Sequence, residues 1–356
     1  MKLSSCQMML LLIAGSIVPN THFYSELARQ SGAFQIACLN GELLDTGLLQ
    51  SRIQAWISGP NAGLLSWLDR RAEVLSHPFD SRPWAKSLLL VVFVPVPDPD
   101  NPLFQLPKAV SGRPAARLAA YTLNEDYHRT GLRILDRIIQ YLDLSAGELE
   151  AGVDAGALLE KSMAVAAGLG CYGYNTLLRT AEWGTQVHLG YLFSARPLPV
   201  KIHPSEIHPD CADCRLCLQS CPNQALSSTA GLQLQLCRSF LASEKKGALT
   251  WREQQLLGGA LAGCSLCSRC CPGTTLLPGE DFSIDAEEFC KMPAFLLERL
   301  MKGTVLQHIG VTRLKRNAVA ALGTQLPHAQ RSAMQQSLLN CSNSENVRKT
   351  LYNWPT

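Results

Sequence analysis

The sequence has few charged residues, few aromatic residues and no apolar run long enough to cross a bilayer. Charged residues make up 17% of the 356 positions and aromatic residues 7%, whereas hydrophobic residues make up 47%. A disordered chain is richer in charge and poorer in apolar residues, so this composition excludes disorder and allows a sizeable core. Residues 8–18 are apolar, but these eleven positions fall well short of the roughly 20 that a spanning helix needs.

The first residues also lack the marks of an export signal. No small-x-small cleavage site follows the apolar stretch, and no twin arginine precedes it. We therefore expect residues 1–21 to be an N-terminal extension rather than a targeting peptide. The expected location is cytoplasmic, with no membrane partner.

Eight of the fourteen cysteines fall into two closely spaced runs with one isolated position between them. The pattern reads Cys211-x2-Cys214-x2-Cys217-x3-Cys221-Pro222, then Cys237, then Cys264-x2-Cys267-x3-Cys271-Pro272. In a two-cluster ferredoxin, closely spaced cysteines grip one 4Fe-4S cluster while the cysteine before proline ligates the other. The spacing therefore predicts two clusters. One set is Cys211, Cys214, Cys217 and Cys271, and the other is Cys221, Cys237, Cys264 and Cys267.

Other uses of these cysteines fit less well. Disulfide frameworks are typical of short secreted chains, and zinc sites rarely place four cysteines in eleven positions closed by proline. Cys270 lies beside Cys271 and could compete as a ligand; we interpret it as a spare thiol. Reduced thiolate ligands also favour the cytosol.

Basic residues are concentrated towards the C-terminus. From residue 291 onward there are nine basic and two acidic residues, a net charge of +7, whereas residues 1–290 carry −4. A basic module on a mildly acidic body is typical of a nucleic-acid-binding appendage, although an ordinary solvated helical surface has the same composition.

The pattern of apolar residues predicts a mixed α and β fold. Residues 87–94 and 187–193 are expected strands, and residues 132–142 an expected helix with an apolar stripe. The predicted stripe consists of Leu132, Leu135, Ile138, Ile139 and Leu142. Asp154 is expected to open another helix, where it could act as the N-cap. Residues 295–322 predict two helices and residues 331–339 a third.

Residues between these elements resemble a known family. The matching stretches include residues 154–160, 167–176, 197–199, 237–241 and 313–323, together with Tyr121 and Asp126-Tyr127-His128. Together with the cysteine runs, they resemble the epoxyqueuosine reductases over roughly residues 22–356. That resemblance implies an α+β chain with a corrinoid-binding domain (22–201), a ferredoxin-like cluster domain (202–277) and a helical module of HEAT-like repeats (278–356).

The resemblance also implies a reaction and its residues. Members of this family reduce epoxyqueuosine to queuosine in the wobble position of tRNA, with electrons passing through two 4Fe-4S clusters to cobalamin. Asp154 occupies the position of the proton donor, which fits chemistry in which an alkoxide is a poor leaving group. The resemblance further implies that cofactor contacts come from Asp154, Gly173, Asn175, Thr176 and Ser239, and tRNA contacts from Arg313, Lys315 and Arg316.

Three functions remain open on the sequence. The first is epoxyqueuosine reductase, with tRNA and an unidentified electron donor as partners. The second is a divergent corrinoid and iron–sulfur reductase that acts on another substrate. The third is an iron–sulfur electron-transfer protein without a catalytic corrinoid. Gly168, Gly170 and Gly173 do not discriminate between them, since a helix C-cap and turn would also need glycine.

Overall fold

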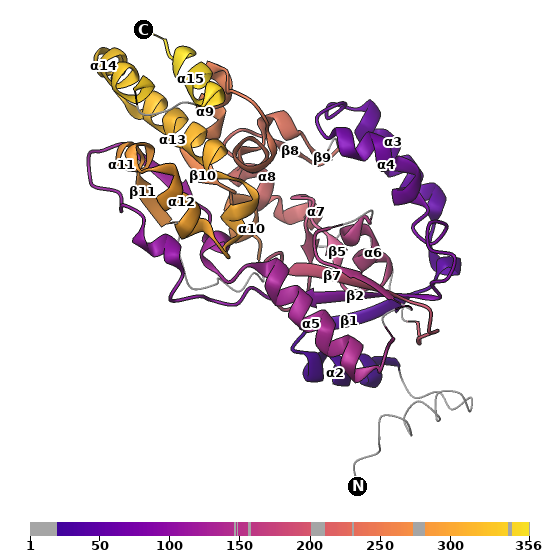
Figure 1. Cartoon of the computed structure of the whole chain (residues 1–356). Helices are drawn as coiled ribbons and strands as arrows, with labels where there is room; N and C mark the ends of the chain where they lie inside the picture. The colour runs from indigo at the N-terminus through magenta and orange to yellow at the C-terminus, as the bar shows by residue number, and fades with distance from the viewer. Residues whose placement is uncertain are drawn as a thin grey trace. The chain divides into compact units, whose positions relative to one another are not determined.

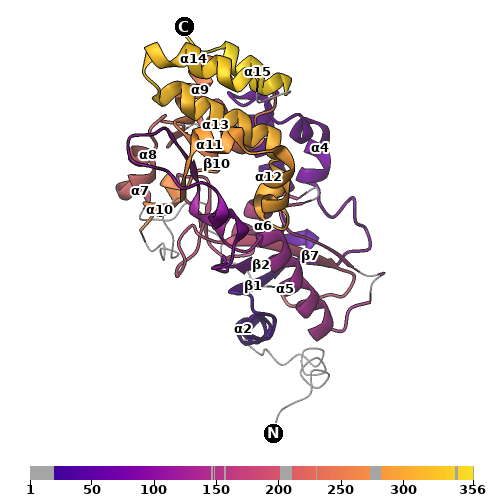
Figure 2. The same cartoon turned by 60° about the vertical axis from the view of Figure 1, so that its left-hand side comes forward.

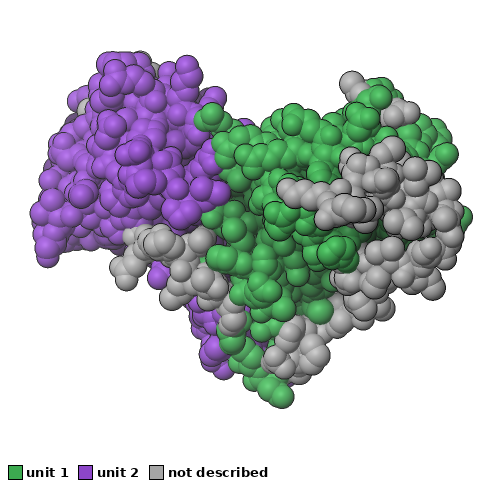
Figure 3. All heavy atoms as spheres, turned by 90° about the horizontal axis from the view of Figure 1, so that it is seen from below, with its two compact units in different colours: residues 1–95, 127–214, 272–275 green, residues 96–126, 215–271, 276–356 purple. Residues whose placement is uncertain are grey.

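A computed structural model describes residues 20–145, 147, 149–155, 158–200, 211–229, 231–272, 282–340 and 344–355. The chain forms two compact units, coloured separately in Figure 3. Unit 1 comprises residues 1–95, 127–214 and 272–275, and unit 2 comprises residues 96–126, 215–271 and 276–356. The four segments expected from the sequence do not coincide with these units, because residues 96–126 join the cluster segment and the C-terminal helices. Most of the expected extension, residues 1–19, lies outside the described residues.

Unit 1 is built on a four-stranded antiparallel sheet in the order β1-β2-β7-β4. Its strands are β1 (Gln35–Leu39), β2 (Ser87–Phe93), β4 (Leu149–Gly152) and β7 (His188–Ser194). The two central strands, β2 and β7, are the apolar runs predicted at residues 87–94 and 187–193, and both predictions are confirmed.

Strand β2 is buried on both faces, which explains its uninterrupted apolar sequence. Alternate side chains of a strand point to opposite faces. Leu89, Val91 and Phe93 pack under α2 and α5, whereas the side chains between them pack under α6. The helices and short elements of unit 1 are α2 (Asn20–Ser31), η1 (Gly41–Leu43), α3 (Thr46–Ser58), α4 (Ser66–Ser76), α5 (Tyr127–Tyr141), α6 (Glu160–Ala166), the hairpin β5 (Cys171–Tyr172) and β6 (Leu178–Arg179), and α7 (Cys211–Cys214).

Helix α5 covers the predicted helix up to residue 141, and most of the predicted apolar stripe is confirmed: Leu135, Ile138 and Leu142 are buried, and Ile139 packs against them. Leu132 was expected in the core and is 46% exposed, so that part of the prediction is wrong. The buried face also includes Ile134 and Gly131, which the sequence did not assign to it. A Cβ at Gly131 would lie 2.7 Å from the Phe93 ring, so the glycine lets the helix approach the sheet and turns Leu132 outward.

Unit 2 contains a three-stranded sheet in the order β10-β3-β11. The central strand β3 (Ala115–Leu118) pairs in parallel with β10 (Ala260–Ala262) and antiparallel with β11 (Phe282–Asp285). The middle strand thus comes from the first half of the chain and both neighbours from the second half. This pairing explains why residues 96–126 belong to unit 2.

Helix α13 lies at the centre of the helices of unit 2 and contacts α9, α11, α15 and β10 (Figures 1 and 2). The C-terminal helices therefore share a core with the cluster segment, unlike repeats that contact only their neighbours. The α-helices of unit 2 are α8 (Leu216–Ser220), α9 (Trp251–Leu257), α10 (Leu266–Arg269), α11 (Ala286–Lys291), α12 (Ala294–Met301), α13 (Val311–Gln325), α14 (His328–Leu339) and α15 (Glu345–Tyr352). The three helices predicted in residues 295–339 are confirmed as α12, α13 and α14.

Short elements complete unit 2. They are η2 (Pro102–Gln105), η3 (Ala120–Leu123), β8 (Leu226–Ser227), β9 (Gly231–Leu232), η5 (Leu234–Leu236), the π-helix η6 (Phe240–Glu244) and η7 (Val305–His308). In the part of the chain that the structure describes, no helix is both long enough and apolar enough to cross a membrane.

Candidate active site and iron–sulfur segment

Asp154 lies on an exposed turn of unit 1, two residues after the end of β4. Its backbone is left-handed, with φ of +47°, a conformation that costs energy for a residue other than glycine. The Tyr127 hydroxyl donates a 2.7 Å hydrogen bond to Asp154 Oδ2. Tyr127 is the first residue of α5, so a helix packed on the sheet fixes one oxygen of an otherwise exposed carboxyl group.

The Tyr127 ring is itself held by stacking. It stacks on His188 with ring centroids 4.4 Å apart and an interplanar angle of 5°, and on His128 at 4.1 Å and 26°. His188 is the first residue of β7 and also contacts the Phe93 ring at 5.6 Å. These contacts restrict the phenol and so restrict the position of the Asp154 carboxyl group. Sequence reasoning noted the Asp126-Tyr127-His128 motif but could not pair it with a residue 27 positions later.

The backbone of the turn is held by the first residue of α6. The Asp154 N–H donates to Glu160 Oε1 at 2.9 Å. Burial, together with the negative charge of Asp154, raises the pKa of Glu160 to about 8. Helix α6 begins at Glu160 and its N-cap is Leu159, so the expectation that Asp154 opens this helix is wrong. Asp154 is therefore not the N-cap of α6.

The other predicted cofactor contacts of unit 1 lie in a tight turn. Gly173, Asn175 and Thr176 belong to the loop of the β5–β6 hairpin, which the Gly173 N–H closes by donating to Leu177 O at 3.0 Å. Thr176 has φ of +61°, and Lys161 Nζ donates to its carbonyl oxygen at 3.0 Å. Lys161 follows Glu160, so the start of α6 is bonded both to the Asp154 turn and to this loop.

Local packing accounts for the glycines near this loop. A Cβ at Gly173 would lie 2.7 Å from Asn175 Oδ1, and one at Gly170 would lie 2.5 Å from Arg179 O. Gly168 has φ of +74° two residues past the end of α6, where its N–H bonds to Val165 O. The helix-end and turn interpretation therefore explains all three without a ligand.

Four of the predicted cluster ligands lie together in unit 2. Cys221, Cys237, Cys264 and Cys267 are free thiols, and Cys267 interacts electrostatically with the other three and also with Cys217, a predicted ligand of the other cluster. Burial and this mutual repulsion raise the pKa of Cys267 above its ordinary value. Four thiolates this close need positive charge among them, so the donor set fits a cationic iron–sulfur core.

Ser239 belongs to this cluster region. The backbone N–H groups of Ser239 and Phe240 bond to the Cys237 thiol, opposing the rise that burial causes in its pKa. Ser239 immediately precedes the π-helix η6. Ser239 was predicted from the resemblance to contact a cofactor, and the structure places its backbone N–H at a predicted iron ligand.

The remaining predicted ligands divide between the units. Cys217 and Cys271 lie in unit 2, while Cys211 and Cys214 form the two ends of α7 in unit 1. Cys270, the spare thiol, lies 3.1 Å from Ser220 Oγ. The Ser220 hydroxyl therefore offers the Cys270 thiol a hydrogen-bond partner, in line with the interpretation that Cys270 does not bind iron.

The predicted tRNA contacts on α13 require a correction. Arg316 is 1% exposed. Its guanidinium donates to the carbonyl oxygens of Leu241, Lys245 and Gly247 at 2.6–2.9 Å. A phosphate cannot reach this side chain, so the prediction is wrong for Arg316. The spacing of charges along a helix does not reveal which of them the fold will bury.

The two neighbouring cations of α13 are half-buried. Arg313 donates to Ser243 O, and Lys315 donates to Met292 O at 2.7 Å. Asn317 extends the same pattern, since its amide donates to Ala242 O and Leu261 O, each at 2.8 Å. This part of α13 thus binds backbone carbonyl groups in and around η6, in β10 and at the end of α11.

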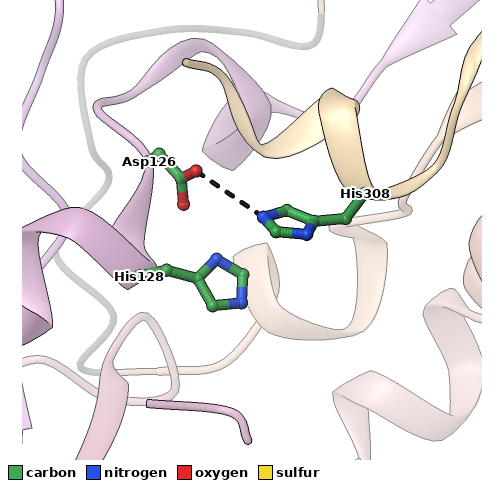
Figure 4. Close-up of side chains that lie close together, drawn as sticks. All are labelled: Asp126, His128 and His308. Atoms are coloured by element: carbon green, nitrogen blue, oxygen red, sulfur yellow. Dashed lines mark ion pairs between the residues drawn. The ribbon is translucent and has the colours of Figure 1, made fainter. Parts of the chain in front are cut away.

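One ion pair of unit 2 was not expected from the sequence. His308 Nε2 lies 3.8 Å from Asp126 Oδ2, as Figure 4 shows. Asp126 is 6% exposed, and His308 is the last residue of η7. Asp126 stands at the end of unit 2's first segment, directly before Tyr127. Nothing in the sequence near residue 308 indicated this pairing.

The cysteine segment and the fold together indicate an iron–sulfur oxidoreductase. Residues 210–274 match a family described as "4Fe-4S double cluster binding domain", so the two-cluster prediction is confirmed. Relatives of known name indicate which kind of iron–sulfur oxidoreductase the chain resembles. The chain is 29% identical to epoxyqueuosine reductase of Escherichia coli over 296 residues, covering 79% of this chain and 76% of the relative. It is 28% identical to that of Pseudomonas aeruginosa over 307 residues, covering 83% and 82%.

Solved structures agree on the fold. Epoxyqueuosine reductase from Streptococcus thermophilus superposes with a TM-score of 0.75 at 20% identity, covering 93% of this chain and 88% of that one. An epoxyqueuosine reductase crystallised with a tRNA-Tyr epoxyqueuosine-modified stem loop gives 0.71 at 20% identity, covering 94% and 98%. The similarity to epoxyqueuosine reductases inferred from the sequence is thereby confirmed.

Proposed function

We propose that this protein is an epoxyqueuosine reductase that acts in the cytoplasm on the wobble position of tRNA. The reaction takes two electrons and two protons, removes the epoxide oxygen as water and leaves the cyclopentene of queuosine. Two 4Fe-4S clusters carry the electrons from a separate donor. Similarity to the reductases over about 80% of the chain supports this proposal, and so does the double-cluster segment.

The observation that carries the proposal is the Asp154 carboxyl group, which is exposed yet fixed by Tyr127. Tyr127 occupies Oδ2, so Oδ1 is the oxygen that can present a proton to the opening epoxide. Once that proton has left, the phenol O–H stabilises the carboxylate that remains. Alkoxide is a poor leaving group, and a positioned general acid typically contributes 10²–10⁴-fold to such a step.

Different sets of residues fit the 4Fe-4S clusters and cobalamin. Cys221, Cys237, Cys264 and Cys267 form a thiolate set that needs positive charge. Cobalamin, when bound, would supply the electron pair that breaks the carbon–oxygen bond. We assign its contacts to Asp154 and to the Asn175–Thr176 turn. Both lie in unit 1, and both carry left-handed non-glycine backbone of the kind that concentrates at ligand sites.

The tRNA contacts are assigned to exposed cations instead of the buried Arg316. Arg299, Lys302 and Arg348 are exposed on the C-terminal helices and the loop after α12. Phosphate contacts fix orientation and give binding a strong salt dependence. Changing Arg299 and Lys302 to Glu should weaken binding of a tRNA stem loop and flatten its salt dependence; unchanged binding at every salt concentration would remove these residues from the interface.

The experiment is the conversion of epoxyqueuosine-tRNA to queuosine-tRNA by Asp154→Asn, with cobalamin, reconstituted clusters and a chemical reductant. Asparagine tolerates the left-handed backbone at position 154 and can still accept from Tyr127. It cannot deliver a proton, so turnover should fall by roughly 100-fold or more. Asp143→Asn is the matched control, because Asp143 also has a left-handed backbone in unit 1, with φ of +49°.

Two results would overturn parts of the proposal. Full activity of Asp154→Asn would remove Asp154 from the chemistry. No activity of the wild type with loaded clusters and cobalamin would favour a divergent reductase with another substrate. Equal losses in Asp154→Asn and Asp143→Asn would indicate damage to the fold of unit 1.

A further inference from the structure

Arg238 follows the predicted iron ligand Cys237, and its guanidinium is held against the end of α9. Arg238 Nε donates to Leu256 O at 3.3 Å. Gly258 has φ of +57°, and a Cβ there would overlap the guanidinium of Arg238. Because glycine has no side chain, position 258 leaves room for the Arg238 guanidinium. A second guanidinium, that of Arg117, donates to Gly258 O at 2.6 Å.

Two ligand-bearing segments meet at the end of α9. Asn223 lies two residues after Cys221, and its amide donates to Leu236 O at 2.8 Å and to Leu256 O at 2.7 Å. Leu256 O thus accepts hydrogen bonds from both Asn223 and Arg238. The network fixes the Cys221 loop, the Cys237 segment and α9 to one another, all within unit 2.

The Arg238 charge acts on two ligands of one predicted cluster. The guanidinium interacts electrostatically with Cys264 and with Cys221, and it is repelled by the guanidinium of Arg117. Arg238 is half-buried, so solvent screens this interaction less than it would at the surface. An electron entering the cluster adds one negative charge among the thiolates, and a fixed cation beside them favours the state that holds it. Net charge around a cluster is one of the properties that set its reduction potential.

We propose that Arg238 raises the reduction potential of the cluster held by Cys221, Cys237, Cys264 and Cys267. The proposal rests on the cluster assignment within the proposed function, and not on the tRNA substrate. The step it concerns is the arrival of one electron from an external one-electron donor, with no proton transferred and no bond broken.

The test compares Arg238→Gln, which removes the charge, with Arg238→Lys, which keeps it. Both clusters are titrated anaerobically with dithionite and followed by electron paramagnetic resonance, without tRNA or cobalamin. The Gln variant should lower the equilibrium constant for reduction of one cluster by about tenfold, which for a one-electron couple corresponds to about 59 mV. The other cluster is the internal control and should not change. The Lys variant should stay close to wild type.

Three outcomes would overturn the proposal. The first is an unchanged potential in the Gln variant, and the second is an equal shift in the Gln and Lys variants, which would indicate packing rather than charge. If Arg238→Gln fails to hold its iron, Gly258→Ala decides, because its methyl group displaces the guanidinium. That variant should lower the same potential, and no change would be the third contrary outcome. Failure of queuosine formation would leave these potentials unaffected, so the two proposals fail separately.

Discussion

The two units hold their chemical groups in opposite ways. In unit 1, Asp154 is exposed on a left-handed turn and is fixed by single hydrogen bonds from a phenol and to Glu160. In unit 2, the segment after Cys237 is fixed by the buried Arg316 and Asn317 through several backbone carbonyl groups. A group that gives a proton to a substrate must be reachable. A ligand that only carries electrons can be buried in a rigid frame, and rigidity lowers the cost of each electron transfer.

The largest expected effect concerns a single ligand of unit 2. Cys237→Ser should lose one cluster completely, lowering the iron content from about eight to about four atoms per chain. Cys270→Ser is the matched control and should keep all the iron, because Cys270 contacts Ser220. Iron and acid-labile sulfide analysis of anaerobically purified protein measures both. Loss of iron in the Cys270 variant would mean that Cys270 is a ligand and that the predicted ligand sets are wrong.

The stability of unit 2 should depend more on the buried cation Arg316 than on the half-buried cation Arg313. Arg316→Met leaves three carbonyl groups, one buried and two half-buried, without their donor. Hydrogen bonds to charged groups contribute about 1.5–3 kcal/mol each, and they are not additive, so we expect a loss of about 3 kcal/mol or more in the free energy of unfolding.

Arg313→Met, one turn away, is the control for Arg316→Met. Its half-buried side chain donates to one carbonyl group, so the loss should be about 1 kcal/mol. Anaerobic urea denaturation compares the two variants. Equal losses would show that burial of Arg316 does not set the difference between them.

Removal of the hydrogen bond from Tyr127 to Asp154 should lower kcat more than it lowers the free energy of unfolding. Tyr127→Phe keeps the ring that stacks on His188 and removes only the hydroxyl group. Loss of one hydrogen bond to a carboxylate should reduce kcat by about tenfold with little change in stability. Tyr141→Phe, at the other end of α5, should leave kcat unchanged. A stability loss without a kcat loss would mean that Tyr127 serves packing alone.

The last expected effect is the pH dependence that Glu160 gives to unit 1. Its pKa in the folded protein, about 8, exceeds the ordinary value of about 4.3 for a glutamate. A raised pKa means that the folded state binds the proton more tightly. The contribution to stability is therefore complete below about pH 4 and is lost as pH rises towards 8. Glu160→Gln does not titrate, so its thermal midpoint should fall less than that of wild type between pH 5.5 and pH 8; parallel curves would contradict the assignment.

The sequence predicted those parts of the molecule that depend on local pattern. The cluster cysteines follow from spacing, and β2 follows from an apolar run buried on both faces. Pairings between distant segments were not predictable. The Tyr127–Asp154 bond depends on how α5 packs on the sheet, and the burial of Arg316 depends on carbonyl groups about 70 residues earlier. Asp154 itself was identified by resemblance, and its supposed role in opening α6 was wrong because the helix begins at Glu160.

The position of β3 in the chain has a consequence for synthesis. Its partners β10 and β11 begin at residues 260 and 282, long after β3 ends at residue 118. At the usual ~5–20 residues per second, roughly 7–30 seconds pass on the ribosome before β3 can pair with β10. During that interval the strand has neither of its neighbours, and its unpaired backbone groups are a site for aggregation or for chaperone binding. Cys211, Cys214, Cys217, Cys221 and Cys237 are translated within the same interval, so neither predicted ligand set is complete until Cys267 and Cys271 have also been translated.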